Sequence, residues 1–224
     1  MPIYKIKNEN FFKKWTPEMA YVLGFFAADG NMLKNKRGAY FIEFQSTDKE
    51  IIYKIRKVLK TNLAIGEYQS KHKNHNKRYR LQIGSKEMFN DLLKLGLTPN
   101  KSLTLKMPKV PDRYFSHFTR GYFDGDGNAT IARYKNSKRH NKMRVTILSG
   151  FTCGSKKFLE GLFIKLRELT NISGGTLYYH SGGYRLFFSV KDSLVLYKFM
   201  YANTTNNLFL SRKKEIFEKY FKIR

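Results

Sequence analysis

The sequence predicts an α+β protein built from two similar halves, each with the order helix, two strands, helix, two strands, helix. The first observation is a repeated stretch: residues 22–30 read VLGFFAADG, and residues 119–127, which begin 97 positions later, read TRGYFDGDG. The second is that, after each copy, stretches with the alternating pattern of strands and stretches with the spacing of helices follow one another in the same order. We therefore expect two pseudosymmetric αββαββα repeats, residues 1–97 and 112–224, joined by a linker over 98–111.

Both repeated stretches are expected to form the last turns of a helix. Thr16, Pro17 and Glu18 supply a capping hydroxyl, a proline at the first helical position and an acid in the first turn. Pro111 and Asp112 give the second helix a similar start. In each copy the apolar run then ends at an aspartate followed by a glycine, which is a common way for a helix to stop.

Small residues occupy one face of each of these helices. Gly24 and Ala28 are one helical turn apart in the first copy, and Gly121 and Gly125 are one turn apart in the second. Two such faces allow two backbones to approach closely. We expect the two helices to pack against each other at the centre of the molecule, with Gly24 and Gly121 at the interface.

The remaining elements follow in the same order in both halves, and three of the five prolines fall in the linker between them. In the first half we expect strands at 31–34 and 39–46, a helix from 47, strands at 63–70 and 78–84, and a helix at 85–95. In the second half we expect strands at 128–134 and 143–151, a helix at 155–169, strands at 174–180 and 184–190, and helices at 191–201 and 208–221.

Each half therefore has four strands, which we expect to form an antiparallel sheet covered by helices on one face. The alternation in residues 78–83 indicates which face is covered: Tyr79, Leu81 and Ile83 point one way. Arg78, Arg80 and Gln82 point the other way and form an open, basic face. Two such faces related by the central helices would form one long positive saddle.

Composition points to a polyanionic partner. The chain has 43 Lys and Arg against 17 Asp and Glu, a net charge of +26 and a pI of about 10.1. Nucleic acid is the first candidate and an anionic membrane surface the second, although a lysine-rich face is often only a solvated surface. The single cysteine, Cys153, excludes an intramolecular disulfide and a cysteine zinc cluster. With no long apolar run and no secretory signal, we expect an intracellular protein of the cytoplasm, nucleoid or an organelle, without a membrane partner. We also expect the protein to be a monomer.

The two aspartates that end the repeated stretches are the candidate metal ligands. Asp29 and Asp126 would sit where unpaired carbonyl groups and the helix dipole already concentrate negative charge. If the helices are parallel, both carboxylates and the carbonyl oxygens of Ala28 and Gly125 converge on one small volume. Such hard oxygen ligands suit Mg²⁺; we expect Mn²⁺ to substitute and Ca²⁺ to bind without turnover. The alternative is that each Asp-Gly pair is only a helix stop.

The two stretches resemble the LAGLIDADG motif of homing endonucleases. Gly24 and Gly121 match its third position, and the Asp-Gly pairs that begin at Asp29 and Asp126 match its last two. The first copy departs from the motif at Ala27, where an acid is usual. The resemblance implies a single-chain, two-repeat endonuclease that cuts both strands of a long asymmetric DNA duplex across the minor groove and leaves short 3′ overhangs, with metals held by the two aspartates.

The resemblance also implies a lysine near the metals, after the third helix of the repeat. Lys101 lies there, although it could be one more surface lysine. Aligning Leu208 with Leu103 puts Asn206 opposite Lys101, which predicts unequal pockets and unequal strand-cutting rates. Gln45 and Asp48 align near polar positions at the border of the family's active site, and Asp48 could equally be a helix cap.

The candidate DNA-contacting residues are chosen from the strands and the turn between the first two. They are Lys34, Arg37, Gln45, Arg78, Arg80, Gln82, Arg133, Arg144 and Arg185. Hairpin-tip residues are expected to touch the phosphate backbone: Lys73, Asn76, Lys138 and Arg139. The main rival function is binding without cleavage, as an intron RNA maturase or a DNA-binding regulator of the same fold. Retention of both motif aspartates favours the nuclease.

Overall fold

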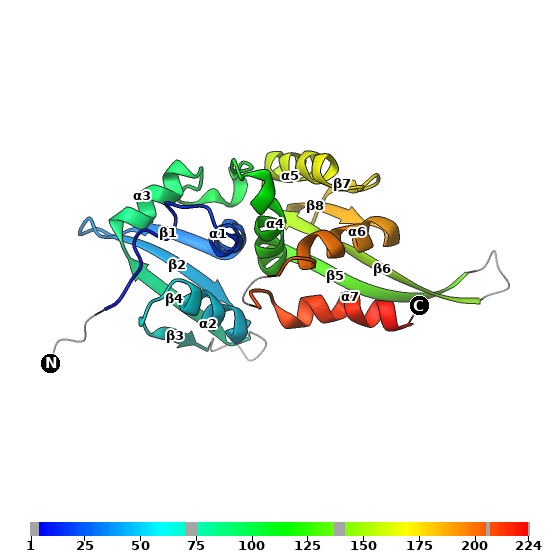
Figure 1. Cartoon of the computed structure of the whole chain (residues 1–224), viewed down its shortest axis with the longest axis horizontal. Coiled ribbons are helices and arrows are strands. Elements are labelled where there is room, and N and C mark those ends of the chain that lie inside the picture. Colours follow the sequence, from blue (N-terminus) through cyan, green and yellow to red (C-terminus); the bar gives the residue numbers. More distant parts are fainter. Residues whose placement is uncertain (1–4, 70–75, 137–141, 205–206, 224) are drawn as a thin grey trace.

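The computed structural model describes residues 5–69, 76–136, 142–204 and 207–223. It contains two four-stranded antiparallel sheets, one on each side of a central pair of helices (Figure 1). This is the α+β, two-repeat architecture that the sequence predicts. Within the described residues, no helix is both long enough and apolar enough to span a bilayer.

The first half has seven elements and the strand order β1-β2-β4-β3. They are α1 (Pro17–Asp29), β1 (Gly30–Lys34), β2 (Tyr40–Ser46), α2 (Lys49–Val58), β3 (Ile65–Tyr68), β4 (Arg78–Gly84) and α3 (Lys86–Lys94). The two hairpins are thus joined through their second strands, β2 and β4, which lie side by side in the middle of the sheet.

The second half repeats this order with the sheet β5-β6-β8-β7. A short 3₁₀ turn, η1 (Lys101–Leu103), lies in the connection between the halves. The elements that follow are α4 (Asp112–Asp126), β5 (Gly127–Asn136), β6 (Lys142–Cys153), α5 (Lys156–Leu169), β7 (Thr176–His180), β8 (Gly183–Phe188), α6 (Val190–Tyr201) and α7 (Ser211–Ile223). Helix α7 extends the second half beyond the repeat and lies alongside β5 (Figure 1).

Helices α1 and α4 contact each other through their backbones at the two predicted glycines. A Cβ atom added to Gly24 would lie 2.1 Å from the carbonyl oxygen of Phe118, and one added to Gly121 would lie 2.0 Å from that of Tyr21. Further along, Gly125 faces Ala28. Later residues of α1 therefore contact later residues of α4, so the two helices run parallel, as the sequence analysis assumed.

Each central helix also packs against its own sheet. Phe26 of α1 meets Phe44 of β2 with ring centroids 5.1 Å apart, and Phe123 of α4 meets Phe151 of β6 at 5.7 Å. Both pairs are edge-to-face, a favourable aromatic geometry. Because α1 touches α4 on one side and a sheet on the other, residues 19–27 are all buried. This packing fixes the end of each central helix relative to the first strand of its sheet.

Candidate active site

The structure brings the two predicted carboxylates together. Asp29 is the last residue of α1 and Asp126 the last residue of α4, and the parallel helices end at the same level. The gap between them is kept narrow by small residues: a Cβ atom on Gly125 would lie 2.4 Å from that of Ala28 and 3.4 Å from Oδ2 of Asp29. Each aspartate is followed directly by the first strand of its sheet.

The electrostatics of this pair favour a cation. Burial, together with the neighbouring Asp126 carboxylate, raises the pKa of Asp29 to about 7, and the nearby ammonium groups of Lys213 and Lys101 oppose this shift. Burial also raises the pKa of Asp126, although its side chain still reaches solvent. Two neighbouring carboxylates whose pKa values are raised by burial, and for Asp29 also by the like charge beside it, gain from a counter-ion held between them.

These residues fit a divalent cation whose coordination is completed from outside the protein. Within the described part of the chain, no group of three or more His, Cys, Asp and Glu residues could hold a metal. Mg²⁺ does not need such a cage, because it is often bound by one or two carboxylates, substrate phosphates and water. The carbonyl oxygen of Gly125 accepts a hydrogen bond from Lys213, so metal ligation there remains a prediction that requires this lysine to share or leave the oxygen.

Lys101 is a buried residue at the end of the first central helix. Only 7% of it is exposed, and its Nζ donates a hydrogen bond to the carbonyl oxygen of Gly30, just beyond Asp29. Burial lowers the pKa of its ammonium group, whereas the carboxylates of Asp126 and Asp29 oppose that shift. The reading of Lys101 as one more solvated surface lysine is therefore wrong.

A second lysine, which the sequence analysis missed, caps the other central helix. The Nζ of Lys213 in α7 donates to four carbonyl oxygens, those of Phe123, Asp124, Gly125 and Gly127, at 2.7–2.9 Å. The carbonyl groups of Asp124 and Gly125 are among the acceptors that a helix leaves unpaired at its C-terminus, where a cation is favoured, whereas that of Phe123 also accepts the backbone N–H of Gly127. Burial lowers the pKa of Lys213 to about 8.

Lys213 contacts the second central helix where Lys101 contacts the first. Lys101 binds the carbonyl oxygen of Gly30, and Lys213 binds that of Gly127, the residue at the same place in the repeat. Asn206 lies outside the described residues. The alignment of Leu208 with Leu103 did not identify Lys213, because Lys213 lies on helix α7 whereas Lys101 lies on the short turn η1. The sequence does carry a signal: Phe217 and Tyr220 are buried at helical spacing from Lys213.

Asp124, the acid that the second motif carries where the first has Ala27, has a structural role. Asp124 is buried, accepts a hydrogen bond from the hydroxyl of Tyr21 at 2.5 Å and another from the backbone N–H of Leu210 at 2.8 Å. It thus joins α1, α4 and the segment that leads into α7. Burial raises its pKa to about 6. The first motif has Ala27 at this position and makes no equivalent link.

A cavity of about 410 Å³ adjoins Asp29 and holds several of the predicted site residues. It is lined by Asp29, Gln45, Ser46, Thr47, Asp48, Arg78, Asp124, Gly125 and Arg212. Asp48 stands at the N-cap position of α2 but makes no capping bond; its carboxylate instead binds the Arg212 guanidinium at 2.8 and 2.6 Å. The two halves are therefore connected at the rim of this cavity.

The structure divides the predicted DNA-contacting residues between two faces. The open face of the first sheet carries Gln45, Arg78, Arg80 and Gln82 (with Gln45 opposite Arg80), and that of the second carries Arg144 and Arg185. Arg37 is exposed in the turn between β1 and β2.

Two of the predicted residues lie on the wrong face. Lys34 is two positions from buried Met32, and Arg133 is two positions from Ile131, which packs against the core. Residues two apart in a strand share a face, so both point to the helix side of their sheets, contrary to the expectation of a shared open face. Of the hairpin-tip residues, Asn76 is described and exposed, whereas Lys73, Lys138 and Arg139 lie outside the described residues.

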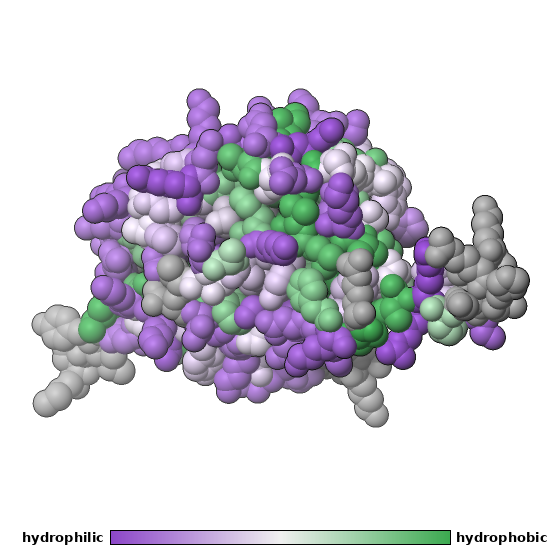
Figure 2. All heavy atoms as spheres, turned by 45° about the vertical axis from the view of Figure 1, so that its right-hand side comes forward, coloured by the Kyte–Doolittle hydropathy of each residue, from purple (hydrophilic) through white to green (hydrophobic). Residues whose placement is uncertain are grey.

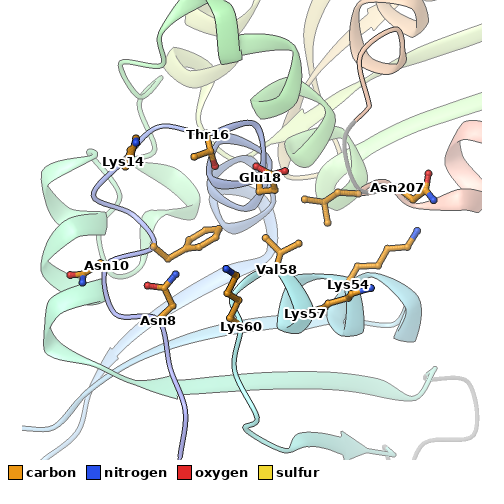
Figure 3. Close-up of a pocket in the computed structure, with 12 residues that line it drawn as sticks. Asn8, Asn10, Lys14, Thr16, Glu18, Lys54, Lys57, Val58, Lys60 and Asn207 are labelled. Carbon is orange, nitrogen blue, oxygen red and sulfur yellow. The ribbon is translucent and has the colours of Figure 1, made fainter.

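A larger cavity, of about 870 Å³, lies at the opposite end of α1, beside Thr16 and Glu18. Figure 3 shows Lys60 reaching into it, whereas Lys54 and Lys57 extend toward the side where Asn207 lies. The ammonium group of Lys54 is already bound by Glu50 at 2.6 Å and by a backbone carbonyl at 2.8 Å. The lysine ammonium groups around this cavity point in different directions, and the cavity lies at the end of α1 opposite the paired aspartates.

Comparison with known sequences agrees with the repeated motif. Residues 16–95 match the family of LAGLIDADG-like domains. An uncharacterized protein of Methanocaldococcus jannaschii is 26% identical over 117 residues, which cover 51% of this chain and 40% of that protein. DNA-directed RNA polymerase subunit Rpo1C of the same organism is 27% identical over 158 residues, 70% of this chain and 16% of the subunit. This chain thus spans less than half the length of either relative.

Solved structures match over almost the whole chain. The meganuclease I-AabMI bound to uncleaved DNA has a TM-score of 0.62 at 14% identity, covering 93% of this chain and 90% of that one. I-SmaMI bound to an uncleaved DNA target with calcium ions has a TM-score of 0.62 at 13% identity, covering 94% and 90%. A variant of I-DmoI with its target DNA and manganese has a TM-score of 0.56 at 17% identity, covering 89% and 99%. These likenesses confirm the predicted two-repeat fold.

Proposed function

We propose that this chain, which has a LAGLIDADG-like domain over residues 16–95 and the two-repeat fold of the LAGLIDADG meganucleases, is a site-specific DNA endonuclease. It would cut a long asymmetric duplex by metal-dependent phosphodiester hydrolysis and leave short 3′ overhangs. The observation that carries this proposal is the pairing of Asp29 and Asp126 between two open sheet faces, in a chain with a net charge of +26.

Divalent cations would be held by the Asp29 and Asp126 carboxylates. Mg²⁺ is the expected cofactor, with Mn²⁺ as a substitute and Ca²⁺ as a cation that binds without turnover; the I-SmaMI and I-DmoI complexes were obtained in the presence of calcium and manganese respectively. When bound, such a metal lowers the pKa of a water molecule and stabilises charge on the phosphate and the leaving oxygen. The chain contributes the carboxylates that fix the cation and the central helices that fix the carboxylates.

The two buried lysines would supply positive charge on either side of the aspartates. Lys101 and Lys213 each lie close enough to both carboxylates to oppose the rise in the pKa of Asp29 and of Asp126. A phosphate that approaches the aspartates would meet these ammonium groups, which offset the repulsion between phosphate and carboxylate. Because the two lysines contact equivalent carbonyl oxygens, each central helix would have one such group beside it for one DNA strand.

The duplex would lie across the open faces of both sheets. Arg78 and Arg80 on the first sheet and Arg144 and Arg185 on the second would contact bases and phosphates. Since one chain contains both repeats, a monomer would suffice to cut both strands. DNA as the partner implies action inside the cell, in the cytoplasm, nucleoid or a DNA-containing organelle.

The test is cleavage of a randomised duplex library in Mg²⁺ and in Ca²⁺, followed by sequencing of the cut ends. We expect the wild type to yield defined 3′ overhangs at one long site in Mg²⁺ only. Asp126→Asn should abolish cleavage but retain or increase DNA affinity, because it removes a negative charge beside phosphate. Asp112→Asn is the matched control, since it removes an exposed carboxylate from the opposite end of α4 and should leave cleavage unchanged.

The other outcomes would contradict the proposal. Enrichment of bound DNA in both cations without cut ends would indicate a non-cleaving regulator, and preference for structured intron RNA over any duplex would indicate a maturase. If Asp126→Asn abolished binding as well as cleavage, Asp126 would be a structural residue and not a metal ligand.

A further inference from the structure

An acidic residue lies in the middle of the proposed DNA-binding face of the first sheet. Glu43 of β2 belongs to this open face, because Ile42 and Phe44 on either side of it are buried against the helices. Only 7% of Glu43 is exposed. A buried carboxylate on the face that would meet phosphate needs a specific explanation, because it repels the proposed ligand.

The neighbours of Glu43 supply that explanation. In the sheet register, Asn31 of β1 lies directly opposite Glu43 on one side, and Gln82 of β4 lies opposite it on the other. The Asn31 side-chain NH₂ donates to Oε2 of Glu43 at 3.4 Å, and that of Gln82 donates to Oε1 at 2.6 Å. The Arg80 guanidinium lies 3.6 Å from the same Oε1. One carboxylate thus holds two amides and an arginine.

This arrangement determines which end of each amide faces outward. A carboxylate accepts hydrogen bonds and donates none, so both side-chain amides must turn their NH₂ groups toward Glu43. Their carbonyl oxygens are then left as the outward acceptors. Asn31 and Gln82 are both exposed, unlike Glu43, so these oxygens are accessible on the open face. A free asparagine or glutamine would present either end.

We propose that Glu43 is a specificity-determining residue that makes the first sheet read bases bearing an exocyclic amino group. In the major groove such donors belong to adenine and cytosine, whereas guanine and thymine present carbonyl oxygens at the corresponding place. The paired contact that a free amide makes to adenine also requires the NH₂ group, and Glu43 holds that group on the side of the carboxylate through one of its two hydrogens. This inference rests on the proposed function, since it assumes that the open face meets DNA.

The second sheet lacks this device, so the preference belongs to one half-site. The equivalent row across the second sheet is Asn128, Gly150 and Phe187, with glycine at the place of Glu43. Gly150 has no side chain to orient its neighbours, and Phe187 has no hydrogen-bonding group. The two halves of the target would therefore be read by different chemistry, although the two sheets have the same strand order.

The experiment is selection of bound duplexes from a randomised library in Ca²⁺, comparing wild type with Glu43→Gln. We expect the wild-type site to contain positions restricted to adenine or cytosine in one half only. In Glu43→Gln the new amide can donate or accept, so discrimination at two of these positions should fall about fivefold each, as expected for one net hydrogen bond. Glu67→Gln is the matched control: it makes the same charge change on the helix side of β3 and should leave the profile unchanged.

Two further variants keep the test independent of folding. Asn31→Ala and Gln82→Ala remove one exposed amide each, and each should erase the preference at one position only. Thermal melting of all variants would identify any that unfold, and if Glu43→Gln did so these two would decide the matter. Identical profiles for the variants and the wild type would overturn the inference while leaving the proposed function intact. If the wild type enriched no duplex, the proposed function and this inference would both fail.

Discussion

The two buried lysines, Lys101 and Lys213, differ in the number of carbonyl groups to which they donate. Lys101 donates to one carbonyl oxygen beyond α1, whereas Lys213 donates to four at the end of α4. An ammonium group has three protons, so four acceptors saturate it. Lys213 is therefore held more firmly in place than Lys101. Its loss would take the ammonium donor away from the carbonyl groups of Asp124 and Gly125 at the end of α4.

Replacement of Lys213 by methionine should reduce stability strongly. Methionine keeps the length of the side chain but donates no hydrogen bond, and unsatisfied buried acceptors are costly; we expect a loss of about 3 kcal/mol in the free energy of unfolding. Lys214→Met is the control, because that lysine makes an ion pair with the partly exposed Glu218 and a contact with the Phe209 ring but donates to no buried carbonyl group that is described, and it should contribute about 1 kcal/mol. Urea unfolding would measure both. Equal losses would mean that the contacts of Lys213 are not the cause.

The raised pKa of Asp29 predicts an unusual pH dependence of stability. Its pKa is about 7 in the folded chain against 3.8 as the ordinary value, so between these values the folded state holds a proton that the unfolded chain releases. Without divalent cations, the free energy of unfolding should therefore fall as pH rises from about 4 to about 7, and stay low above it. Asp29→Asn should remove this part of the dependence.

Cation binding should show the opposite trend, because a bound cation must replace that proton. Calorimetric titration with Mn²⁺ should give an affinity that increases with pH up to about 7 and then levels off. A cation affinity that does not change between pH 5 and pH 8 would contradict the assignment of Asp29 as a ligand. The Asp29→Asn variant, which has no carboxylate to titrate, provides the baseline for this measurement.

At the scale of elements, the central helices have no space for even one extra carbon atom. Gly24→Ala would place its Cβ atom 2.1 Å from a carbonyl oxygen of α4, and Gly121→Ala would place one 2.0 Å from a carbonyl oxygen of α1. Backbone cannot give way as a side chain can, so we expect each change to destabilise the chain by about 3 kcal/mol and to separate the two aspartates. Gly66→Ala is the control, since its Cβ atom meets nothing nearer than 3.8 Å.

Thermal melting and DNA cleavage would test these glycine variants together. Gly24→Ala and Gly121→Ala should melt earlier and lose cleavage activity, whereas Gly66→Ala should retain the wild-type melting temperature. A variant with an unchanged melting temperature would show that α1 and α4 can move apart at low cost. The close contact would then not be what fixes the spacing of the metal-binding carboxylates.

The elements that the sequence predicts well are those defined by local patterns. Both central helices end at the predicted aspartates, and the order of strands and helices follows from hydrophobic period. What could not be predicted depends on contacts between distant residues. Arg212 binds Asp48 across 164 positions, and Lys213 reaches α4 from 86 to 90 positions away. No local pattern encodes such distances.

The errors in the DNA-facing set have a different cause. The prediction for Lys34 and Arg133 rests on their charge alone. Each lies two positions from a residue that packs against the helices, Met32 or Ile131, and is therefore on the helix side of its sheet. The sequence itself shows which residues of each strand share a face, and that pattern would have excluded both from the set of DNA-contacting residues. Glu43 illustrates the reverse problem, because a carboxylate does not look like a nucleic-acid contact until its two amide neighbours are known.

At the scale of the whole molecule, the fold is symmetric while its surfaces are not. The two sheets have the same strand order, but only the first has the row centred on Glu43. Hydrophilic side chains cover much of the face seen in Figure 2, with hydrophobic ones gathered across its middle. An asymmetric DNA target is the natural partner of such a protein, because each half of the site would meet a different set of side chains.

The net charge of +26 predicts a steep salt dependence of DNA binding. Each phosphate that the protein neutralises releases counter-ions, and the logarithm of affinity falls with the logarithm of salt concentration by about 0.9 per phosphate. Contacts from both sheets, with about six phosphates, would give a slope of about −5. Arg78→Gln and Arg144→Gln, one on each sheet, should each make the slope shallower by about 1 if they touch phosphate.

Lys60→Gln provides the matched control for these two variants. It makes the same change of charge in the cavity at the far end of α1, and should leave the slope unchanged. If all three changes reduced the slope equally, the protein would attract DNA through its overall charge without a defined binding face. If only Arg78→Gln or only Arg144→Gln did so, the duplex would contact one sheet alone, and a single chain could not place both strands at the paired aspartates.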